Sequence, residues 1–355
     1  MKGQEVMRAY RITDWLAPAR LVEVPRPDPG PHQVRVRVGG CGLCHSDLVM
    51  GQMGEAVGRA IGWTVPFTLG HETAGWIDGI GRDVDPALGF SDGDPVALVS
   101  PASCGACRWC VRGQENACGQ GLVGRGYGRD GGLADYVVVD DPGRSLLAIG
   151  GLDPTTAGPL VDAGATSHHA IRRVLAGLRS DSTVVVVGVG GLGGFAVQLL
   201  RALSPARVVA VDSSARRRKV ALDCGAHHVV SGVDGATASV LGAIVGRDPV
   251  DAVLDMVGTD DTISFATGIV SPGGSVGLVG AAGGTLRRPW FGGLPRDGQV
   301  FTFQGSDVAD ARGVIALAGQ GLVRVDVDRF TLTDVGRAYE ALESGELSGR
   351  AVVQP

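Results

Sequence analysis

The sequence predicts an α/β protein in which an irregular β-rich region is joined to a doubly wound parallel sheet. Three observations support this prediction: closely spaced short β patterns early in the chain, a strand–glycine turn–helix segment in the middle, and a regular strand–helix alternation after it. The chain has 355 residues, enough for two domains with substantial cores. Its 58 glycines and 44% apolar residues are typical of a tightly turned globular protein and exclude a disordered one.

The first part of the chain carries short β patterns punctuated by proline and glycine, with little helical periodicity. The clearest of them are Val34–Val38, Gly75–Ile80, Pro95–Val99 and Tyr136–Val139. Short strands separated by frequent turn residues are typical of a compact β domain that carries long functional loops. We expect this domain at residues 1–163.

The middle of the chain alternates strands with helices. Val184–Val187 is an unbroken run of β-branched residues, as expected for a strand buried on both faces of a parallel sheet. A helix is expected at Gly193–Leu203, a second strand at Val208–Val211, and a second helix at Ala215–Cys224. This alternation predicts a doubly wound sheet at 164–301.

The last segment, 302–355, returns to shorter patterns. A helix is expected at Val335–Ser344 and a final strand at Ala351–Val353. We expect this tail to return to the first domain.

Charge and composition narrow the partners and the compartment. The net charge is −5 and no basic stripe is present, so neither a nucleic acid nor a membrane is expected as a partner. The most apolar stretch, Val184–Leu200, is broken by glycines and favours a buried strand and helix over a membrane span. Seven cysteines, an odd number with four of them clustered, favour thiolate metal ligation in a reducing cytoplasm over a disulfide framework.

The cysteine cluster is the strongest local signal. Four thiolates in one short loop can complete a tetrahedral shell around Zn²⁺, which leaves no open position and makes the site structural. An iron–sulfur cluster and free buried cysteines are the alternatives. We expect a zinc lobe at about residues 100–120, bound by Cys104, Cys107, Cys110 and Cys118, with tight turns at Gly105 and Gly113.

The glycine turn after Val187 fits the G-x-G-x-x-G pattern in its required strand–turn–helix setting. Such glycines let the backbone approach a pyrophosphate whose charge meets the helix N-terminus. Asp212 ends the next strand and can accept hydrogen bonds from ribose hydroxyls, which favours NAD over NADP. The alternative is a glycine-packed strand–helix contact beside an ordinary surface Asp. The expected dinucleotide-binding residues are Gly188, Gly190, Gly191, Leu192, Gly193, Asp212 and Arg217.

A second metal group is indicated by Cys44, which follows a strand, and by His71 within Gly70-His71-Glu72. Catalytic zinc needs three protein ligands and one open position. Asp162 is a carboxylate inside an apolar run, and a buried carboxylate needs a cation or metal partner. Each of these residues, taken alone, is more often structural.

These elements together resemble the zinc-containing medium-chain dehydrogenase/reductase family, specifically its alcohol dehydrogenases, over essentially the whole chain. The resemblance implies a GroES-like catalytic domain followed by a Rossmann domain, two zinc ions and NAD(H). It implies Cys44 and His71 as ligands of the catalytic zinc. The third ligand is often a Cys in a Leu-Cys-Ala-Gly stretch, where this chain has Val161-Asp162-Ala163-Gly164. A bacterial secondary-alcohol dehydrogenase branch is similar in having Asp there, so Asp162 is the expected ligand.

The resemblance also implies roles around the catalytic zinc. Ser46 would be the first proton carrier, Asp47 the partner of the ligand His, and Glu72 a carboxylate close behind the metal. Some members complete the relay with a His where this chain has Val49. The last step would then run through the nicotinamide ribose or through His45, which can instead face the cofactor pyrophosphate.

The expected activity is hydride transfer between NAD(H) and a small alcohol, with a tilt towards secondary alcohols and their ketones. Alternatives are a polyol or aldehyde reductase, a nicotinoprotein dismutase that keeps its cofactor, and an NAD(H)-binding sensor without turnover. Trp63, Trp290 and Phe291 are candidate pocket walls, although such residues more often fill a core or an interface, and the segment Trp290–Gly298 could equally be a subunit contact. The resemblance implies a homo-oligomer, a tetramer or else a dimer.

Overall fold

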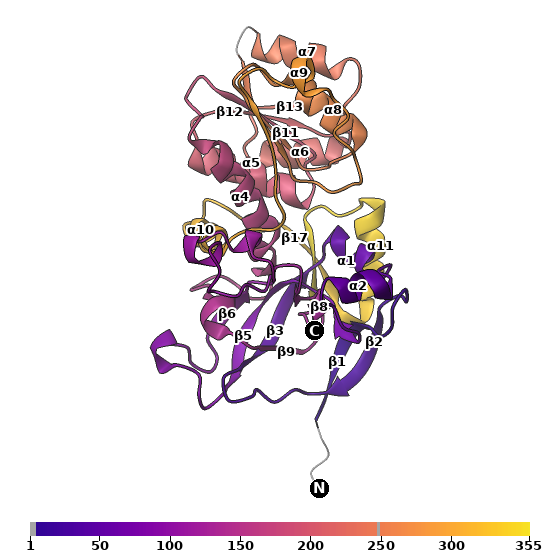
Figure 1. Ribbon diagram of the computed structural model, residues 1–355, viewed down its shortest axis with the longest axis vertical. Helices are drawn as coiled ribbons and strands as arrows, with labels where there is room; N and C mark the ends of the chain where they lie inside the picture. Colours follow the sequence, from indigo (N-terminus) through magenta and orange to yellow (C-terminus); the bar gives the residue numbers. More distant parts are fainter. Residues whose placement is uncertain (1–4, 247–248) are drawn as a thin grey trace. The chain divides into compact units, whose positions relative to one another are not determined.

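The computed structural model describes residues 5–246 and 249–355 (Figure 1). The chain forms two units: Met1–Ala165 together with Ser306–Pro355, and Thr166–Gly305. The last part of the chain therefore belongs to the same unit as the first. Within the described ranges, no helix has the length and apolarity needed to cross a lipid bilayer.

The first unit is built mainly from short antiparallel strands. They are β1 Val6–Ile12, β2 Arg20–Pro25, β3 Val34–Gly42, β4 Phe67–Thr68, β5 Glu72–Ile80, β6 Pro95–Leu98, β7 Gly124–Arg125, β8 Gly128–Arg129, β9 Tyr136–Val139, β10 Leu146–Ala148, β17 Val327–Thr331 and β18 Arg350–Gln354. A three-stranded sheet has the order β2-β1-β4, and a larger sheet has the order β10-β6-β5-β3-β18-β17, with β9 paired to β3. The strands β7 and β8 form a separate pair.

Helices in this unit are few and mostly short. They are α1 His45–Met50, α2 Glu55–Ala60, α3 Pro142–Ser145, α10 Val308–Gly319 and α11 Val335–Ser344, with the 3₁₀ turns η1 Pro86–Leu88, η2 Cys110–Arg112, η3 Glu115–Ala117, η4 Gly158–Val161 and η5 Leu332–Asp334. The helix α11 packs against α1, β17 and β18. A core of buried apolar side chains, including Leu43, Phe67, Leu133, Leu332 and Val353, lies among these elements.

Two strand pairings position the functional residues of this unit. The strand β5 is antiparallel to β3, with Glu72 opposite Gly42. The C-terminal strand β18 is antiparallel to β3 on its other side, with Val353 opposite Cys41. The end of β3, the start of β5 and the last strand of the chain therefore meet at one place in the sheet.

The second unit is a six-stranded parallel sheet of order β13-β12-β11-β14-β15-β16. Numbered from its first strand, this order is 3-2-1-4-5-6, the order of a Rossmann fold. The strands are β11 Thr183–Val187, β12 Arg207–Val211, β13 His228–Val230, β14 Val250–Asp255, β15 Ser275–Leu278 and β16 Gln299–Thr302. This confirms the predicted α/β class, with an irregular β domain and a doubly wound parallel sheet.

Helices cover the parallel sheet. They are α5 Gly191–Leu203, α6 Ala215–Asp223, α7 Thr237–Val245, α8 Asp260–Ile269 and the short α9 Trp290–Gly293, while α4 Ala163–Leu175 begins at the end of the first unit. The helix α5 packs on β11 and β12, α6 on β12 and β13, and α8 on β14 and β15 (Figure 1). Valines on the strands, such as Val185 and Val253, are fully buried beneath them.

Several elements differ from the sequence prediction, and two of them have a clear physical reason. The apolar pattern predicts a helix over Ala170–Leu178, but α4 begins earlier, at Ala163, because the small residues at its start give no apolar periodicity. The strand β16, at the edge of the sheet, was not predicted, because its pattern Gln-Val-Phe-Thr places one polar residue at each end of only two apolar ones.

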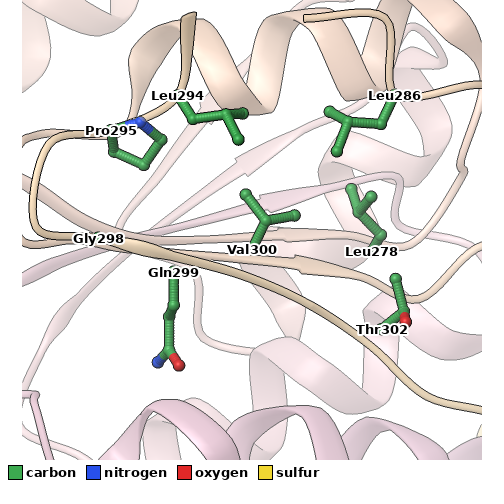
Figure 2. Close-up of a pocket in the computed structure, with 8 residues that line it drawn as sticks. All are labelled: Leu278, Leu286, Leu294, Pro295, Gly298, Gln299, Val300 and Thr302. Atoms are coloured by element: carbon green, nitrogen blue, oxygen red, sulfur yellow. The ribbon is translucent and has the colours of Figure 1, made fainter. Parts of the chain in front are cut away.

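A pocket of about 410 Å³ lies beside this edge strand. Figure 2 shows Val300 pointing toward Leu286 and Leu294, whereas the neighbouring Gln299 points away, as alternating residues of a strand do. The remaining lining residues are Leu278, Pro295, Gly298 and Thr302. Trp290 and Phe291, which lie in the sequence between the lining residues Leu286 and Leu294, are 79% and 80% exposed.

Candidate metal and nucleotide sites

Four side chains of the first unit form a candidate metal site. The ligand atoms of Cys44, His71, Glu72 and Asp162 all lie within 4.8 Å of one another. Cys44 is the N-cap of α1, directly after β3, and Asp162 follows η4. The group draws on three separate stretches of chain, so no sequence spacing reveals it as a unit.

The position of His71 depends on the glycine before it. Gly70 has a φ of +96°, and a Cβ there would lie 2.6 Å from Cys41 Sγ and 2.7 Å from the Leu133 backbone nitrogen. Only glycine can take this left-handed conformation in so little space. The turn brings the His71 imidazole towards the end of β3 and buries it to 4% exposure.

Asp47 fixes the orientation of the His71 ring. Its Oδ1 lies 3.0 Å from His71 Nδ1, and its Oδ2 accepts a hydrogen bond from the Cys44 backbone N–H at 2.9 Å. A proton held on Nδ1 by the carboxylate leaves the lone pair of Nε2 free for a metal. His71 Nε2 lies 3.6 Å from Asp162 Oδ2 and 3.5 Å from the Ser46 hydroxyl.

Neighbouring groups in this site shift the pKa values of Asp162, His71 and Cys44 towards their charged forms. Burial raises the pKa of Asp162, but the hydrogen bond and charge of His71 outweigh it and bring the pKa down to about 2. Burial lowers the pKa of His71, but Asp47 and Asp162 raise it well above its usual value. Burial opposes ionisation of Cys44, yet His71 and Arg350 leave the pKa of its thiol lowered. Thiolate, imidazole and carboxylate together form a donor set that fits zinc.

Glu72 is held by a different partner. Arg350, the first residue of β18, donates from Nε to Glu72 Oε2 at 3.0 Å and from a second nitrogen to Oε1. Both side chains are buried, and burial raises the pKa of Glu72 while Arg350 opposes this effect. The carboxylate reaches this position because the facing residue of β3 is Gly42, where a Cβ would lie 2.1 Å from Glu72 Oε2.

Besides Arg350, the surroundings of the metal group contain Tyr127, which the sequence also did not indicate. The ring of Tyr127 meets the His71 imidazole edge-on, with 5.5 Å between centroids, and burial raises the pKa of Tyr127 to about 12. It reaches the site because Gly126 packs directly on Gly70. His45 and Ser46 are exposed at the start of α1, and Val49 is 60% exposed.

The four clustered cysteines form a second metal group. Their sulfur atoms lie within 4.8 Å of one another, with Cys104 and Cys110 at 3.9 Å and Cys107 and Cys110 at 3.6 Å. Sulfurs around a tetrahedral zinc at about 2.3 Å stand about 3.8 Å apart, so the spacing fits the ion. Gly105 and Gly113 have φ of +71° and +69°, which confirms the predicted turns.

Backbone hydrogen bonds favour the thiolate form of Cys104, whereas burial raises the pKa of Cys110 to about 12. The Cys107 backbone N–H donates to Cys104 Sγ at 3.2 Å, and the Cys104 N–H donates to Cys118 Sγ at 3.4 Å. Hydrogen bonds from the Ala106 and Cys107 backbones lower the pKa of Cys104 to about 6. The ligand form of the Cys104 sulfur is therefore stabilised before any metal binds.

The glycine turn of the second unit has the geometry of a dinucleotide site. Gly188 has a φ of +85°, and a Cβ on Gly193 would lie 1.8 Å from the Gly188 carbonyl oxygen, so this glycine allows close packing of helix on strand. At Gly190, the N-cap of α5, a Cβ would meet only Arg217, at 3.9 Å. The open space at Gly190, before the first turn of α5 with Gly191 and Leu192, suits a pyrophosphate.

Asp212 closes this turn. Its Oδ2 accepts from the Val189 backbone N–H at 2.8 Å and its Oδ1 accepts from the Ser214 N–H at 2.8 Å. The carboxylate is thereby fixed at the end of β12, beside the glycine turn. Arg217 lies on the first turn of α6, whose N-cap is Ser214.

Comparison with known proteins identifies the family. The chain matches the alcohol dehydrogenase GroES-like domain over residues 30–149 and the zinc-binding dehydrogenase domain over residues 191–320. It is 32% identical to the NAD-dependent alcohol dehydrogenase of Sulfurisphaera tokodaii, over 98% of this chain and 100% of that one. The chain belongs to the zinc-containing alcohol dehydrogenase family.

Solved structures of this family share the fold throughout. The alcohol dehydrogenase of the archaeon Aeropyrum pernix has a TM-score of 0.87 at 31% identity, covering 98% of this chain and 100% of that one. Acetophenone reductase from Geotrichum candidum, solved in complex with NAD, has a TM-score of 0.86 at 27% identity, covering 100% and 99%. The expected family, the GroES-like and Rossmann folds, and the enzyme class of a zinc-dependent, NAD-linked alcohol dehydrogenase are thereby confirmed.

The aromatic candidates lie in different settings in this alcohol dehydrogenase. Trp63 is 7% exposed in the apolar core, where its Nε1 donates to the Leu122 carbonyl at 2.7 Å. It therefore fills the core, one of its two expected roles. Trp290 and Phe291 lie at the surface of the second unit and contact each other edge-on.

Proposed function

We propose that this enzyme interconverts small secondary alcohols and their ketones, at a catalytic zinc bound by Cys44, His71 and Asp162. The observation that carries the proposal is the convergence of these ligand atoms within 4.8 Å. A zinc ion held by one thiolate, one imidazole and one carboxylate would keep one coordination position open for a substrate.

Asp162 is favoured over Glu72 as the third ligand. Both carboxylates lie within 4.8 Å of the ligand atoms of Cys44 and His71, but Glu72 is engaged at both oxygens by Arg350. Asp162 has only His71 Nε2 within ion-pair distance among the described residues, and a zinc ion would replace that contact. Glu72 would then remain a neighbouring charge that keeps Arg350 in place.

Zinc bound here supplies a positive charge that lowers the pKa of an alcohol hydroxyl, and NAD⁺ supplies the hydride acceptor. The exposed Ser46 hydroxyl, 3.5 Å from His71 Nε2, is placed to take the proton that the alcohol loses. Asp47 keeps the proton of His71 on Nδ1 and so maintains the ring as a neutral ligand. With Val49 on the next turn of α1, the proton leaves Ser46 through the cofactor ribose or His45.

Three further features belong to the same proposal. The family resemblance and the likeness to acetophenone reductase favour ketones as substrates over aldehydes. Asp212 favours NAD(H) over NADP(H), because its carboxylate would repel a ribose 2′-phosphate. We also infer a cytoplasmic homo-oligomer, a tetramer or else a dimer.

The test is a substrate panel of primary alcohols, secondary alcohols, polyols and aldehydes, followed by NADH absorbance, with zinc quantified per chain. Two zinc ions per chain and the highest kcat/KM for secondary alcohols are expected. A preference for polyols or aldehydes would overturn the substrate class, and binding of NADH without turnover of any substrate would overturn the activity. Bound nucleotide that survives gel filtration would indicate a nicotinoprotein instead.

Two variants test the ligand assignment. Asp162→Asn is expected to hold one zinc per chain and to lose turnover, since the charge that attracts the ion is gone. Glu72→Gln is its matched control and is expected to keep two zinc ions. The reverse pattern would assign the third ligand to Glu72.

A further inference from the structure

The partners of Asp47 do not end at His71. Asp47 is 2% exposed, and its Oδ2 is occupied by the Cys44 backbone N–H. Its Oδ1 faces His71 Nδ1 at 3.0 Å, yet makes no hydrogen bond of good geometry among the described residues. A carboxylate oxygen can accept two donors, so a second donor at Oδ1 would complete it.

Such a donor lies on α11. Tyr339 is 7% exposed, and its hydroxyl also lacks a well-formed hydrogen bond among the described residues. Burial and the neighbouring Asp47 carboxylate raise the pKa of Tyr339 well above its usual value, so the phenol keeps its proton. The helices α1 and α11, which carry Asp47 and Tyr339, pack against each other.

We propose that Tyr339 is a positioning residue that donates its phenolic proton to Asp47 Oδ1 and thereby fixes the His71 imidazole for metal binding. A buried hydroxyl without a hydrogen bond, and a buried carboxylate oxygen whose one contact is poorly aligned, each carry a free-energy penalty, which one bond between them reduces. The bond would stop Asp47 from rotating, and the His71 ring would keep Nε2 directed at Cys44 and Asp162. This inference depends on the proposed role of His71 as a ligand.

A purely structural role of Tyr339 makes a different prediction. Its ring packs in the apolar core, 6.0 Å from the ring of Tyr10 between centroids. Replacement by phenylalanine keeps this ring and removes only the hydroxyl. Tyr339→Phe therefore separates positioning from packing, and Tyr10→Phe is a matched control in the same cluster.

The experiment measures zinc release from the intact holoenzyme in excess chelator. Release is expected in two kinetic phases, one for each zinc site. The phase that is absent in Cys44→Ser reports the catalytic site, and the phase that remains in this variant reports the four-cysteine lobe. Tyr339→Phe is expected to accelerate the Cys44-dependent phase by up to about tenfold, because direct partners of ligand histidines contribute about 10–100-fold to metal affinity. The four-cysteine phase, and both phases of Tyr10→Phe, should match the wild type.

A double-mutant comparison checks the route through the carboxylate. In an Asp47→Asn background, Tyr339→Phe should no longer change the Cys44-dependent phase. An unchanged rate in Tyr339→Phe, an equal acceleration in Tyr10→Phe, or a full effect in the Asp47→Asn background would each overturn the inference. A wild-type protein with no Cys44-dependent zinc would overturn the proposed function as well, which distinguishes the two failures.

Discussion

Nδ1 of His71 lies 3.0 Å from Oδ1 of Asp47, and neither side chain is exposed by more than 4%. The two residues come from different elements, α1 and the turn before β5, yet the contact decides which nitrogen of the imidazole faces Cys44. The proposed catalytic metal site of this alcohol dehydrogenase would thus depend on a residue that does not itself bind the ion.

Replacing Asp47 by Asn should weaken zinc binding at the catalytic site by about 10–100-fold, because the carboxylate that orients His71 loses its charge. Competition titration with a chromophoric chelator measures this affinity. Asp83→Asn, which changes an exposed carboxylate in the same unit, is the control. Equal zinc affinity in Asp47→Asn and the wild type would contradict the orienting role.

Ser46→Ala should lower turnover in both directions by about 100-fold or more, the range of a lost proton carrier, with zinc content unchanged. The hydroxyl lies 3.5 Å from His71 Nε2, a proposed zinc ligand, so it would be close to an alcohol bound at that zinc. Steady-state kinetics with alcohol and with ketone measure the effect. Ser46→Thr, which retains the hydroxyl, should recover much of the rate, and full activity in Ser46→Ala would remove Ser46 from the relay.

Zinc affinity at the Cys44 site should rise with pH. Burial alone would lower the pKa of His71, but Asp47 and Asp162 raise it well above the ordinary 6.5, so Nε2 holds a proton in the metal-free protein at neutral pH. Zinc must displace that proton, and affinity therefore increases from about pH 6.5 up to the raised pKa. Calorimetry in two buffers of different ionisation enthalpy measures the proton release.

The raised pKa of His71 has the opposite effect on the stability of the metal-free protein, which should fall as pH rises. A proton on His71 stabilises the folded state at every pH below about 6.5, the pKa of this residue in the unfolded chain. This contribution is lost as pH rises through the higher pKa that His71 has in the folded state. The His71 contribution should therefore make chelator-treated protein less stable against unfolding at pH 9 than at pH 6. A pH-independent zinc affinity would contradict both expectations.

The two metal groups should respond differently to loss of a thiolate. Cys107→Ser opens the four-cysteine shell and should chiefly lower the melting temperature, since a structural zinc contributes folding free energy. Cys44→Ser should abolish turnover with a smaller change in melting temperature. Thermal unfolding and zinc content, measured on both variants, decide this. Equal effects on stability and activity would undo the division into structural and catalytic sites.

Asp212→Asn should reduce the preference for NAD over NADP. The amide can still accept a hydrogen bond at Oδ1, but the negative charge that repels a 2′-phosphate is removed. The ratio of kcat/KM for the two cofactors measures the change, and thermal unfolding checks that the turn at Val189 survives. An unchanged ratio would assign cofactor choice to another residue.

Structural features that depend on one short stretch of chain could be predicted from the sequence. The cysteine cluster lies in a single loop, so its spacing alone indicated a tetrahedral metal group. The turn at Gly188 and the strand Val184–Val187 are likewise local, because backbone conformation and burial on both faces leave a direct pattern in the residues. The helix Val335–Ser344 was predicted with its observed bounds for the same reason.

Contacts between distant stretches were decided only by the tertiary structure. The antiparallel pairing of β18 with β3 brings Arg350 to Glu72, and the packing of α11 on α1 brings Tyr339 towards Asp47. Tyr127 meets His71 only because two glycines allow their loops to touch. The sequence by itself determined the local turns, the ligand types and the alternation of strands and helices. Strand pairing and helix packing determined which charges face one another, because that depends on distances through space that no spacing along the chain encodes.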